Sequence, residues 1–267
     1  TVKTDIANTS VTSVLGDVSL TSGSITGSNV SAGTTSNLTT TAGDLVNTTI
    51  EGAKIIATVA GSISGVDADA EVTATLIAGN DIAATTVKAG DIITMTAGGA
   101  IQGTSALGDA AMFLTAGTEI DGSDFTALGD ITVSATDLAA SSFISETGAI
   151  SVGSVANIID STIWAKLGAI TITDVTEELD GSTISAATDL TLTANWIVGS
   201  SLIAENGLLD VTATTIDGSE LLSKLGSIEL SVNALNDSSL AAAIDIDVTG
   251  ADAALSTITA SSMTAAT

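Results

Sequence analysis

The sequence contains no proline, cysteine, histidine, tyrosine or arginine, and only five lysines and five aromatic residues occur among its 267 positions. Without histidine, cysteine, tyrosine and arginine, the chain lacks the usual general base, thiolate nucleophile and anion clamp of enzymes. We therefore expect no catalytic activity and no bound cofactor. The absence of cysteine also excludes disulfide bonds and thiolate metal sites. The absence of proline suits a sheet in which every strand must donate its backbone N–H groups.

Positive charge is also scarce, because 31 acidic residues outnumber five lysines and the formal net charge is −26. Such a chain is repelled by nucleic acids and by anionic membrane surfaces, so neither is an expected partner. No apolar run approaches the roughly 20 residues of a membrane span. The apolar share of 45% is nevertheless too high for a disordered acidic tail, so we expect a folded chain. Because Thr1 opens no signal-peptide pattern, we expect a processed product or a segment of a longer repeat protein.

One short pattern recurs along almost the whole chain: a serine or threonine, any residue, and then an apolar residue. Its first and last hydroxyl residues, Thr9 and Ser256, lie 247 residues and thirteen steps apart, so the mean period is 247/13 = 19.0 residues. A fixed period of this size is typical of solenoids. The hydroxyl positions are Thr9, Ser28, Thr48, Ser64, Thr85, Thr104, Ser123, Ser141, Ser161, Ser182, Ser200, Ser219, Ser238 and Ser256. The apolar positions are Val11, Val30, Ile50, Val66, Val87, Ala106, Phe125, Phe143, Ile163, Ile184, Leu202, Leu221, Leu240 and Ile258.

A second recurring feature is a glycine before a run in which apolar and polar residues alternate, as in 148–152 and 207–211. Alternation with a period of two, in segments rich in Ile, Val and Thr, is typical of half-buried strands. We expect this glycine to supply a turn conformation that is closed to most residues, and Asp-Gly pairs such as Asp121-Gly122 to mark a second turn. A leucine-rich repeat is excluded, because its Leu and Asn spacing is missing and no stretch has helical periodicity.

These patterns predict an all-β fold, a single-stranded parallel β-helix (β-solenoid) that forms one domain over residues 1–267. We expect 13–14 coils of about 19 residues, each with three short strands, in which equivalent residues of successive coils lie above one another. The Ser/Thr position should then face the interior together with the apolar position two residues later. Since a buried hydroxyl without a partner is costly, we expect a ladder of hydroxyls that bond one another or the turn backbone.

Clustered acids are the remaining candidates for catalytic chemistry, because some β-helix enzymes act on polysaccharides with paired carboxylates. The acid pairs are Asp67 and Asp69, Glu177 and Glu178, and Asp245 and Asp247. We interpret these pairs as outward, solvated strand or turn residues, since the basic residues and sugar-stacking aromatics of such enzymes are nearly absent. The exceptions are Trp164 and Trp196, which we interpret as turn or groove packing.

Calcium is the metal that the composition leaves open, because hard cations prefer carboxylate and carbonyl oxygens. A column of aspartates at coil turns would bring carboxylates within a few ångströms of one another, and the candidates are Asp91, Asp109, Asp130 and Asp189. Neither the glycine-and-aspartate nonapeptide of calcium-binding β-rolls nor an EF-hand loop is present. We therefore assign no metal-binding residue, and we expect the negative charge to promote solubility and to oppose lateral aggregation.

The repeat units resemble those of a known family. Residues 129–147 (GDITVSATDLAASSFISET) and 207–225 (GLLDVTATTIDGSELLSKL) are similar to the nineteen-residue repeats of filamentous-haemagglutinin-like bacterial adhesins. The similarity extends over nearly the whole chain and is best from Gly90 to Ala243. It implies a right-handed parallel β-helix and the role of a long extracellular stalk or adhesive fibre. The amino-terminal secretion domain of that family is not recognisable in this sequence.

The expected function is that of a structural or adhesive rod, secreted or at a bacterial cell surface. Its expected partners are copies of itself or neighbouring repeats, end to end, and surface glycans or proteins. One alternative is a self-assembling subunit of an extracellular filament, sheath or surface layer, because neither end of the sequence resembles a capping helix and uncapped coils pair with other strands. Another alternative is a carbohydrate-active β-helix enzyme, which would need a groove with several acids and aromatics on adjacent coils.

Overall fold

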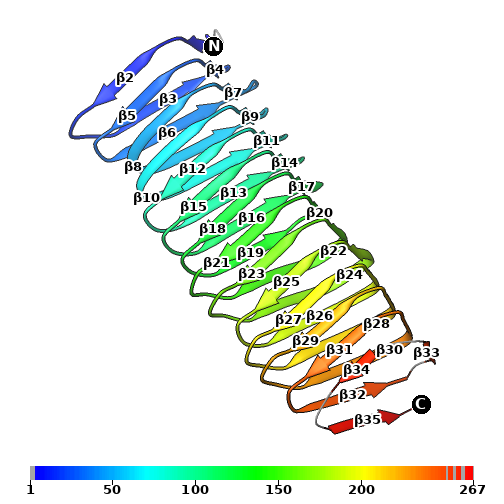
Figure 1. The fold of residues 1–267 in the computed structure, drawn as a ribbon. Helices are drawn as coiled ribbons and strands as arrows, with labels where there is room; N and C mark the ends of the chain where they lie inside the picture. The colour runs from blue at the N-terminus through cyan, green and yellow to red at the C-terminus, as the bar shows by residue number, and fades with distance from the viewer. Residues whose placement is uncertain (1–3, 251, 255–256, 260–261, 267) are drawn as a thin grey trace. The chain divides into compact units, whose positions relative to one another are not determined.

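The computed structural model describes residues 4–250, 252–254, 257–259 and 262–266. These residues form strands and turns without a helix, so the described part of the chain has no helix that could cross a membrane. The strands pair in parallel, and coils of about 19 residues make about 13 turns of a β-solenoid, which confirms the predicted fold class (Figure 1). The chain divides into two compact units, unit 1 (residues 1–128) and unit 2 (residues 129–267).

Most strands are short. Those of unit 1 are β1 (Ile6–Ala7), β2 (Ser10–Ser13), β3 (Val18–Ser22), β4 (Ile25–Thr26), β5 (Asn29–Ala32), β6 (Thr35–Thr40), β7 (Leu45–Val46), β8 (Thr49–Val59), β9 (Ile63–Ser64), β10 (Asp67–Ala78), β11 (Ile82–Ala83), β12 (Thr86–Ala89), β13 (Ile93–Ala97), β14 (Ile101–Gln102), β15 (Ser105–Gly108), β16 (Met112–Ala116), β17 (Glu119–Asp121) and β18 (Asp124–Ala127). Those of unit 2 are β19 (Ile131–Ser134), β20 (Asp137–Ala139), β21 (Ser142–Ser145), β22 (Ile150–Ile159), β23 (Thr162–Ala165), β24 (Ile170–Asp180), β25 (Thr183–Ala186), β26 (Leu190–Val198), β27 (Ser201–Ala204), β28 (Leu209–Asp217), β29 (Glu220–Ser223), β30 (Ile228–Asn236), β31 (Ser239–Ala242), β32 (Asp245–Thr249), β33 (Asp252–Ala254), β34 (Thr257–Thr259) and β35 (Ser262–Ala266).

A coil of unit 1 shows the predicted plan of three strands and three turns, for example β11, β12 and β13. In unit 2 two of the three strand segments often merge into one longer strand that continues around a corner, as in β26, β28 and β30. At these corners the pairing of β26, β28 and β30 is interrupted for one residue on each strand, and the register shifts only against β24, which marks bulges in β24. Two consecutive side chains can then point outward at a corner.

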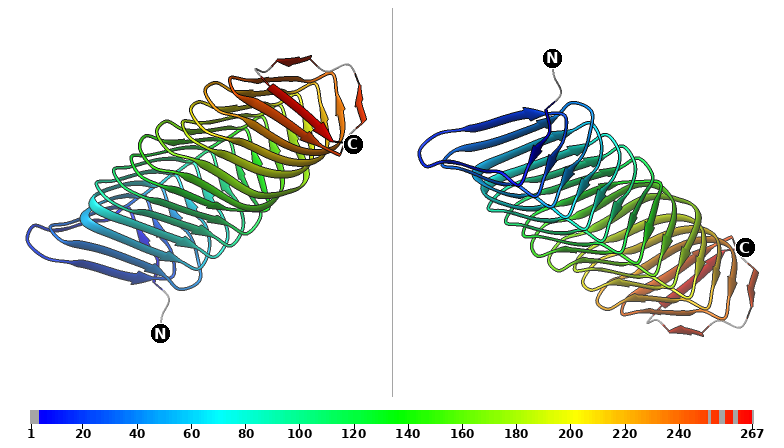
Figure 2. Two further views of the ribbon diagram at one scale, coloured as in Figure 1. Left: turned by 90° about the horizontal axis from the view of Figure 1, so that it is seen from below. Right: turned by 90° about the horizontal axis from the view of Figure 1, so that it is seen from above.

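Within each unit successive coils lie above one another (Figure 2). Their equivalent residues pair in register, so each inward position becomes a column. In unit 2, for example, Ile170, Leu190 and Leu209 are successive partners, and each is fully or almost fully buried. Burying an aliphatic side chain of this size contributes about 1.5–3 kcal/mol. The alternation of inward and outward residues, and the β-branched character of many of them, therefore determine both the strands and the core.

The predicted hydroxyl ladder is confirmed among the described residues, and its partners are backbone groups; Ser256, its last predicted member, lies outside the described residues. The Ser182 hydroxyl donates to the Asp180 carbonyl at 2.9 Å and accepts the Ser161 N–H at 3.0 Å. The same two bonds recur along unit 2, where the ladder runs without a break through Ser141, Ser161, Ser182, Ser200, Ser219 and Ser238. Each hydroxyl thus closes its own turn and pairs a backbone N–H of the neighbouring coil. No described side chain buries a nitrogen or oxygen without a hydrogen-bond partner.

One predicted row of the ladder was wrong. Ser64 pairs with Val46 and lies two positions before the ladder, whereas Val66 occupies the ladder position and is buried. The apolar place in that coil belongs to Ala68, which pairs with Ile50. The sequence Ser-x-Val fits the repeat pattern at Ser64, but only the pairing register shows which coil position it holds. Unit 1 therefore has a gap in its hydroxyl ladder.

The role predicted for the glycine before each alternating run was also wrong. Left-handed backbone conformations occur instead at the turn before the ladder residue, for example at Gly122, Gly181 and Gly218. The glycines before the runs are required by close stacking, because a Cβ on Gly168 would lie 2.0 Å from the Gly148 carbonyl oxygen. Successive turns thus touch through their backbones at this corner.

Candidate interaction surfaces

The acid pairs singled out in the sequence lie on the outside of the coils. Asp67 and Asp69 are exposed on β10, and Glu177 is exposed on β24 beside the half-buried Glu178. The Asn157 amide donates to the Glu177 carboxylate at 3.1 Å. Asp245 and Asp247 are exposed on β32. The predicted outward orientation is therefore confirmed, whereas the absence of catalysis stays a prediction.

The four turn aspartates do not form one column. Asp130 and Asp189 hold equivalent positions in coils that are three steps apart, with Ala149 and Ala169 between them. Each of the two carboxylates accepts a backbone N–H of the next coil at 2.8 Å. Asp91 is level with Ala110 rather than with Asp109. In the described part of the chain, no group of three or more acidic residues is arranged to hold a metal ion.

Asp17 lies in the turn before β3, and its carboxyl accepts two hydrogen bonds from the next coil. Hydrogen bonds from the Thr34 hydroxyl and, more weakly, from the Thr35 N–H lower the pKa of its carboxyl below the usual value. The carboxylate links two coils of unit 1 in the way that Asp130 and Asp189 do in unit 2. Its role is structural.

The two tryptophans are outward residues on different strands and are not register partners. Trp164 on β23 pairs with Ile144 and Ser185, and Trp196 on β26 pairs with Glu178 and Thr215. Their exposed fractions are 42% and 49%. Neither fills the interior, so both are open to contact with other molecules.

The third residue after each ladder residue faces outward and differs between the units. In unit 1 this place is taken in successive coils by Thr12, Ser31, Glu51, Asp69, Lys88, Leu107 and Thr126. In unit 2 it is taken by Ile144, Trp164, Ser185, Ile203 and Leu222. The row is therefore mostly polar or charged in unit 1 and mostly apolar in unit 2.

A second outward row shows the opposite change. It lies on the next strand segment of each coil, directly after the first buried residue of that segment. In unit 1 the row includes Thr75, Thr94 and Phe113. In unit 2 the same place is taken by Thr171, Thr191, Asp210, Glu229 and Asp247. The last three carboxylates are direct neighbours in successive coils, at the parallel-strand spacing of about 4.8 Å. This row is therefore uncharged in unit 1 and strongly acidic at the end of unit 2.

A groove of about 520 Å³ lies along the bulged corner of unit 2. Its side chains are mostly hydroxyls and amides, and it is lined by Asp174, Thr176, Thr193, Ala194, Asn195, Thr212, Ala213, Thr214, Ser231 and Asn233. Asp174 is the only carboxylate among these described lining residues. The side chains of Asn195, Thr214 and Asn233 form no hydrogen bond to another described residue. Their donors and acceptors are therefore available to a ligand.

This groove is hard to predict from the sequence. Its residues Asn195, Thr214 and Asn233 are the corner residues of β26, β28 and β30, where the pairing between these strands is interrupted. The local signal is a pair of consecutive non-core residues, such as Asn195-Trp196, between buried Ala194 and buried Ile197. Such a pair breaks the strict alternation of inward and outward residues along the strand. Only the register shows that the breaks of successive coils lie side by side.

Comparison with known proteins identifies no relative, since no family model, no curated protein and no solved structure matches this chain. The likeness to filamentous-haemagglutinin-like repeats therefore rests on the pattern of the repeats and on the β-solenoid fold that they form.

Proposed function

We propose that this chain is a structural or adhesive β-solenoid segment of a bacterial surface or secreted protein. The observation that carries the proposal is the difference between the inside and the outside of the coils. Inward columns keep the same kind of residue from coil to coil within each unit, whereas outward rows change in charge and polarity. An interior of this kind makes each coil a template for the next, and the outer rows remain available for contacts.

The groove of unit 2 supports the adhesive part of this proposal. Hydroxyl and amide side chains that lack protein partners, such as Asn195, Thr214 and Asn233, can bond the hydroxyls of an uncharged glycan. Their rows repeat once per coil, and that spacing is close to the length of one sugar unit in an extended chain. Trp196, the neighbour of Asn195, adds an exposed ring for stacking.

Binding of the purified chain to immobilised neutral glycans tests the adhesive role. Asn195→Ala with Asn233→Ala should lower binding at least several-fold, because two amide groups leave the groove. The matched control is Thr162→Ala with Thr183→Ala, which changes two exposed residues on another face and should have no effect. Equal binding by both double variants would remove the groove from the proposal, and no binding by the wild type would leave only the structural role.

Electron microscopy of the purified chain tests the structural role. We expect straight, stiff particles of limited length. Filaments that grow with protein concentration would instead favour the alternative of a self-assembling subunit. Flexible or globular particles would contradict both.

A further inference from the structure

Unit 2 carries an apolar surface that its fold leaves uncovered. The outward row of β21, β23, β25, β27 and β29 consists of Ile144, Trp164, Ser185, Ile203 and Leu222. Trp164 is 42% exposed, and the other four residues are half-buried. Leu167 and Leu225, which directly follow Lys166 and Lys224, are also exposed at the turns, by 65% and 62%. We call the five residues of the outward row the apolar strip. Contiguous exposed apolar surface of this kind marks an interaction site.

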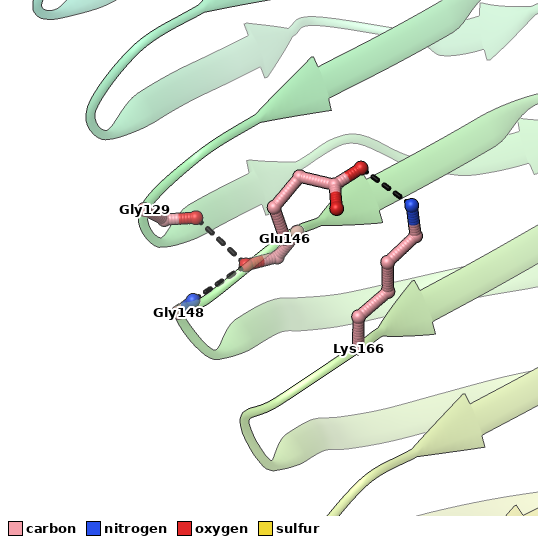
Figure 3. Close-up of polar contacts among 5 residues, drawn as sticks. Gly129, Glu146, Gly148 and Lys166 are labelled. Atoms are coloured by element: carbon pink, nitrogen blue, oxygen red, sulfur yellow. Dashed lines mark hydrogen bonds and ion pairs between the residues drawn. The ribbon is translucent and has the colours of Figure 1, made fainter.

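A row of charges runs beside the apolar strip. The residues that directly follow the same five strands are Glu146, Lys166, Ala187, Glu205 and Lys224. Lys166 lies 2.5 Å from Glu146 and Lys224 lies 2.6 Å from Glu205, and Figure 3 shows the first of these ion pairs. Residues 129–267 contain no other lysine. The charges beside the strip therefore cancel, in a chain whose net charge is −26.

The turns that carry these residues are held in place before any partner binds. The Ser145 hydroxyl donates to the Gly129 carbonyl at 2.8 Å and accepts the Gly148 N–H at 3.0 Å (Figure 3). Ser223 makes the same two bonds to Gly207 and Gly226. The Lys166 ammonium also lies 4.9 Å from the centre of the Trp164 ring. These residues therefore lose little conformational entropy when a partner binds, which favours binding.

When this row of charges is paired with a second copy running in the opposite direction, each charge faces an opposite charge. Along five successive coils the row reads Glu, Lys, Ala, Glu, Lys. A second copy related by a two-fold axis in the contact plane, level with Ala187, presents Lys, Glu, Ala, Lys, Glu. Each glutamate of one copy then lies opposite a lysine of the other. Like charges do not meet anywhere in the row.

The same two-fold axis also pairs the apolar strip with itself. It places Ile144 opposite Leu222 and Trp164 opposite Ile203 of the other copy. The small Ser185 lies opposite its own equivalent at the centre. Large apolar side chains therefore meet large apolar side chains on both sides of the axis, and a self-complementary patch of this kind is what a two-fold dimer requires.

We propose that the apolar strip binds a second copy of this chain, side by side and antiparallel. Nucleic acids and anionic membranes would be repelled by the surrounding carboxylates. A cationic partner would find more unpaired carboxylates on other faces, for example at Asp210, Glu229 and Asp247. This side-by-side pairing does not depend on the adhesive or structural function proposed above.

Sedimentation equilibrium tests the proposal. The wild-type chain should form dimers, and Trp164→Glu with Leu222→Glu should be monomeric at the same concentrations. Carboxylates at these places are compatible with the coil, because Glu51 and Asp69 occupy the equivalent places in unit 1. The control is Thr171→Glu with Thr191→Glu, in the row that already holds Asp210, and it should still dimerise. A wild-type chain that is monomeric throughout, or a dimer that survives the strip variant, would overturn the proposal.

A charge exchange distinguishes this dimer from another assembly through the same surface. Lys166→Glu alone should weaken dimerisation at least about tenfold, because it places like charges across the axis twice. Adding Glu205→Lys should restore the dimer, since opposite charges again face each other between copies although both ion pairs within the chain are lost. Equal weakening by the single and the double variant would contradict the antiparallel arrangement. Thermal unfolding of each variant shows whether unit 2 is still folded.

Discussion

Units 1 and 2 have the same interior and different exteriors. Ile50 in unit 1 and Ile163 in unit 2 hold the same place, two residues after the ladder residue, and both are fully buried. The residues that follow them are Glu51 and Trp164, which point outward and differ in charge, size and polarity. The fold therefore restricts every second residue of a strand and leaves its neighbours free. Differences in function between coils must then arise from the outward rows.

Truncation of the core should produce the largest effect and should be similar in both units. We expect Ile50→Ala and Ile163→Ala to lower the free energy of unfolding by about 2–5 kcal/mol each, through lost burial and the cavity left behind. The outward neighbour Thr162→Ala should change it by less than about 0.5 kcal/mol. Urea unfolding measures all three. A large effect at Thr162, or none at the two isoleucines, would contradict the common interior.

The hydroxyl ladder offers a reciprocal test between the units. Ser182→Ala in unit 2 should destabilise by about 1–3 kcal/mol, because the buried Ser161 N–H loses its acceptor. Val66→Thr in unit 1 fills the gap in the ladder with a hydroxyl of similar shape next to Thr48. It should therefore be neutral or stabilising, by up to about 1 kcal/mol. Strong destabilisation by Val66→Thr would show that position 66 is not part of the ladder.

The backbone contact between successive turns gives an effect of similar or smaller size. Gly168→Ala should destabilise by about 1–3 kcal/mol, because its Cβ would lie 2.0 Å from the Gly148 oxygen. Gly98→Ala in unit 1 should behave alike, since its Cβ would lie 2.2 Å from the Gly79 oxygen. At Gly153 the nearest atom is 3.7 Å away, and alanine there should stabilise the strand by about 0.5–1 kcal/mol. Thermal unfolding of the three variants gives the ranking, and an equal response at all three would contradict it.

The smallest effect is expected where the exteriors differ. Glu229 lies between Asp210 and Asp247 in the acidic row of unit 2, so Glu229→Gln should stabilise by about 0.2–1 kcal/mol through relief of like-charge repulsion. The gain should shrink as salt is added. Thr94→Glu in the equivalent row of unit 1 meets no acidic neighbour and should be nearly neutral. Urea unfolding at low and high salt checks both, and a gain that is independent of salt would exclude a charge effect.

The repeat period and the alternation within each unit made the fold predictable from the sequence. Inward residues are limited to a few apolar types and to the Ser/Thr ladder, so their spacing is visible without a structure. The exact register was less predictable, because the steps between ladder residues vary. Ser161 follows Ser141 by 20 residues, Ser182 follows Ser161 by 21, and Ser200 follows Ser182 by 18. A fixed period of 19 therefore drifts out of alignment with the real coils.

The surfaces were hidden from sequence reasoning for the same reason. The row from Glu146 to Lys224 and the groove around Asn195 combine residues from several coils, and each coil differs in length. Ser64 was misplaced because Ser64-Gly65-Val66 satisfies the repeat pattern locally as well as the true alignment does. Only hydrogen-bonded pairing between coils decides such cases. Rows of outward residues can be assigned only from that pairing, and not from a sequence pattern within a single coil.

The most direct test of the stacked, in-register coils is a pair of engineered cysteines, because the chain has none of its own. Glu51 and Asp69 are register partners on the outside of unit 1, and parallel neighbours about 4.8 Å apart are within disulfide reach. Glu51→Cys with Asp69→Cys should form an intramolecular disulfide on mild oxidation, whereas Glu51→Cys with Asp67→Cys should remain reduced. Efficient oxidation of the second pair but not the first would mean that Ser64, not Val66, lies in the ladder, and would contradict the register on which this account rests.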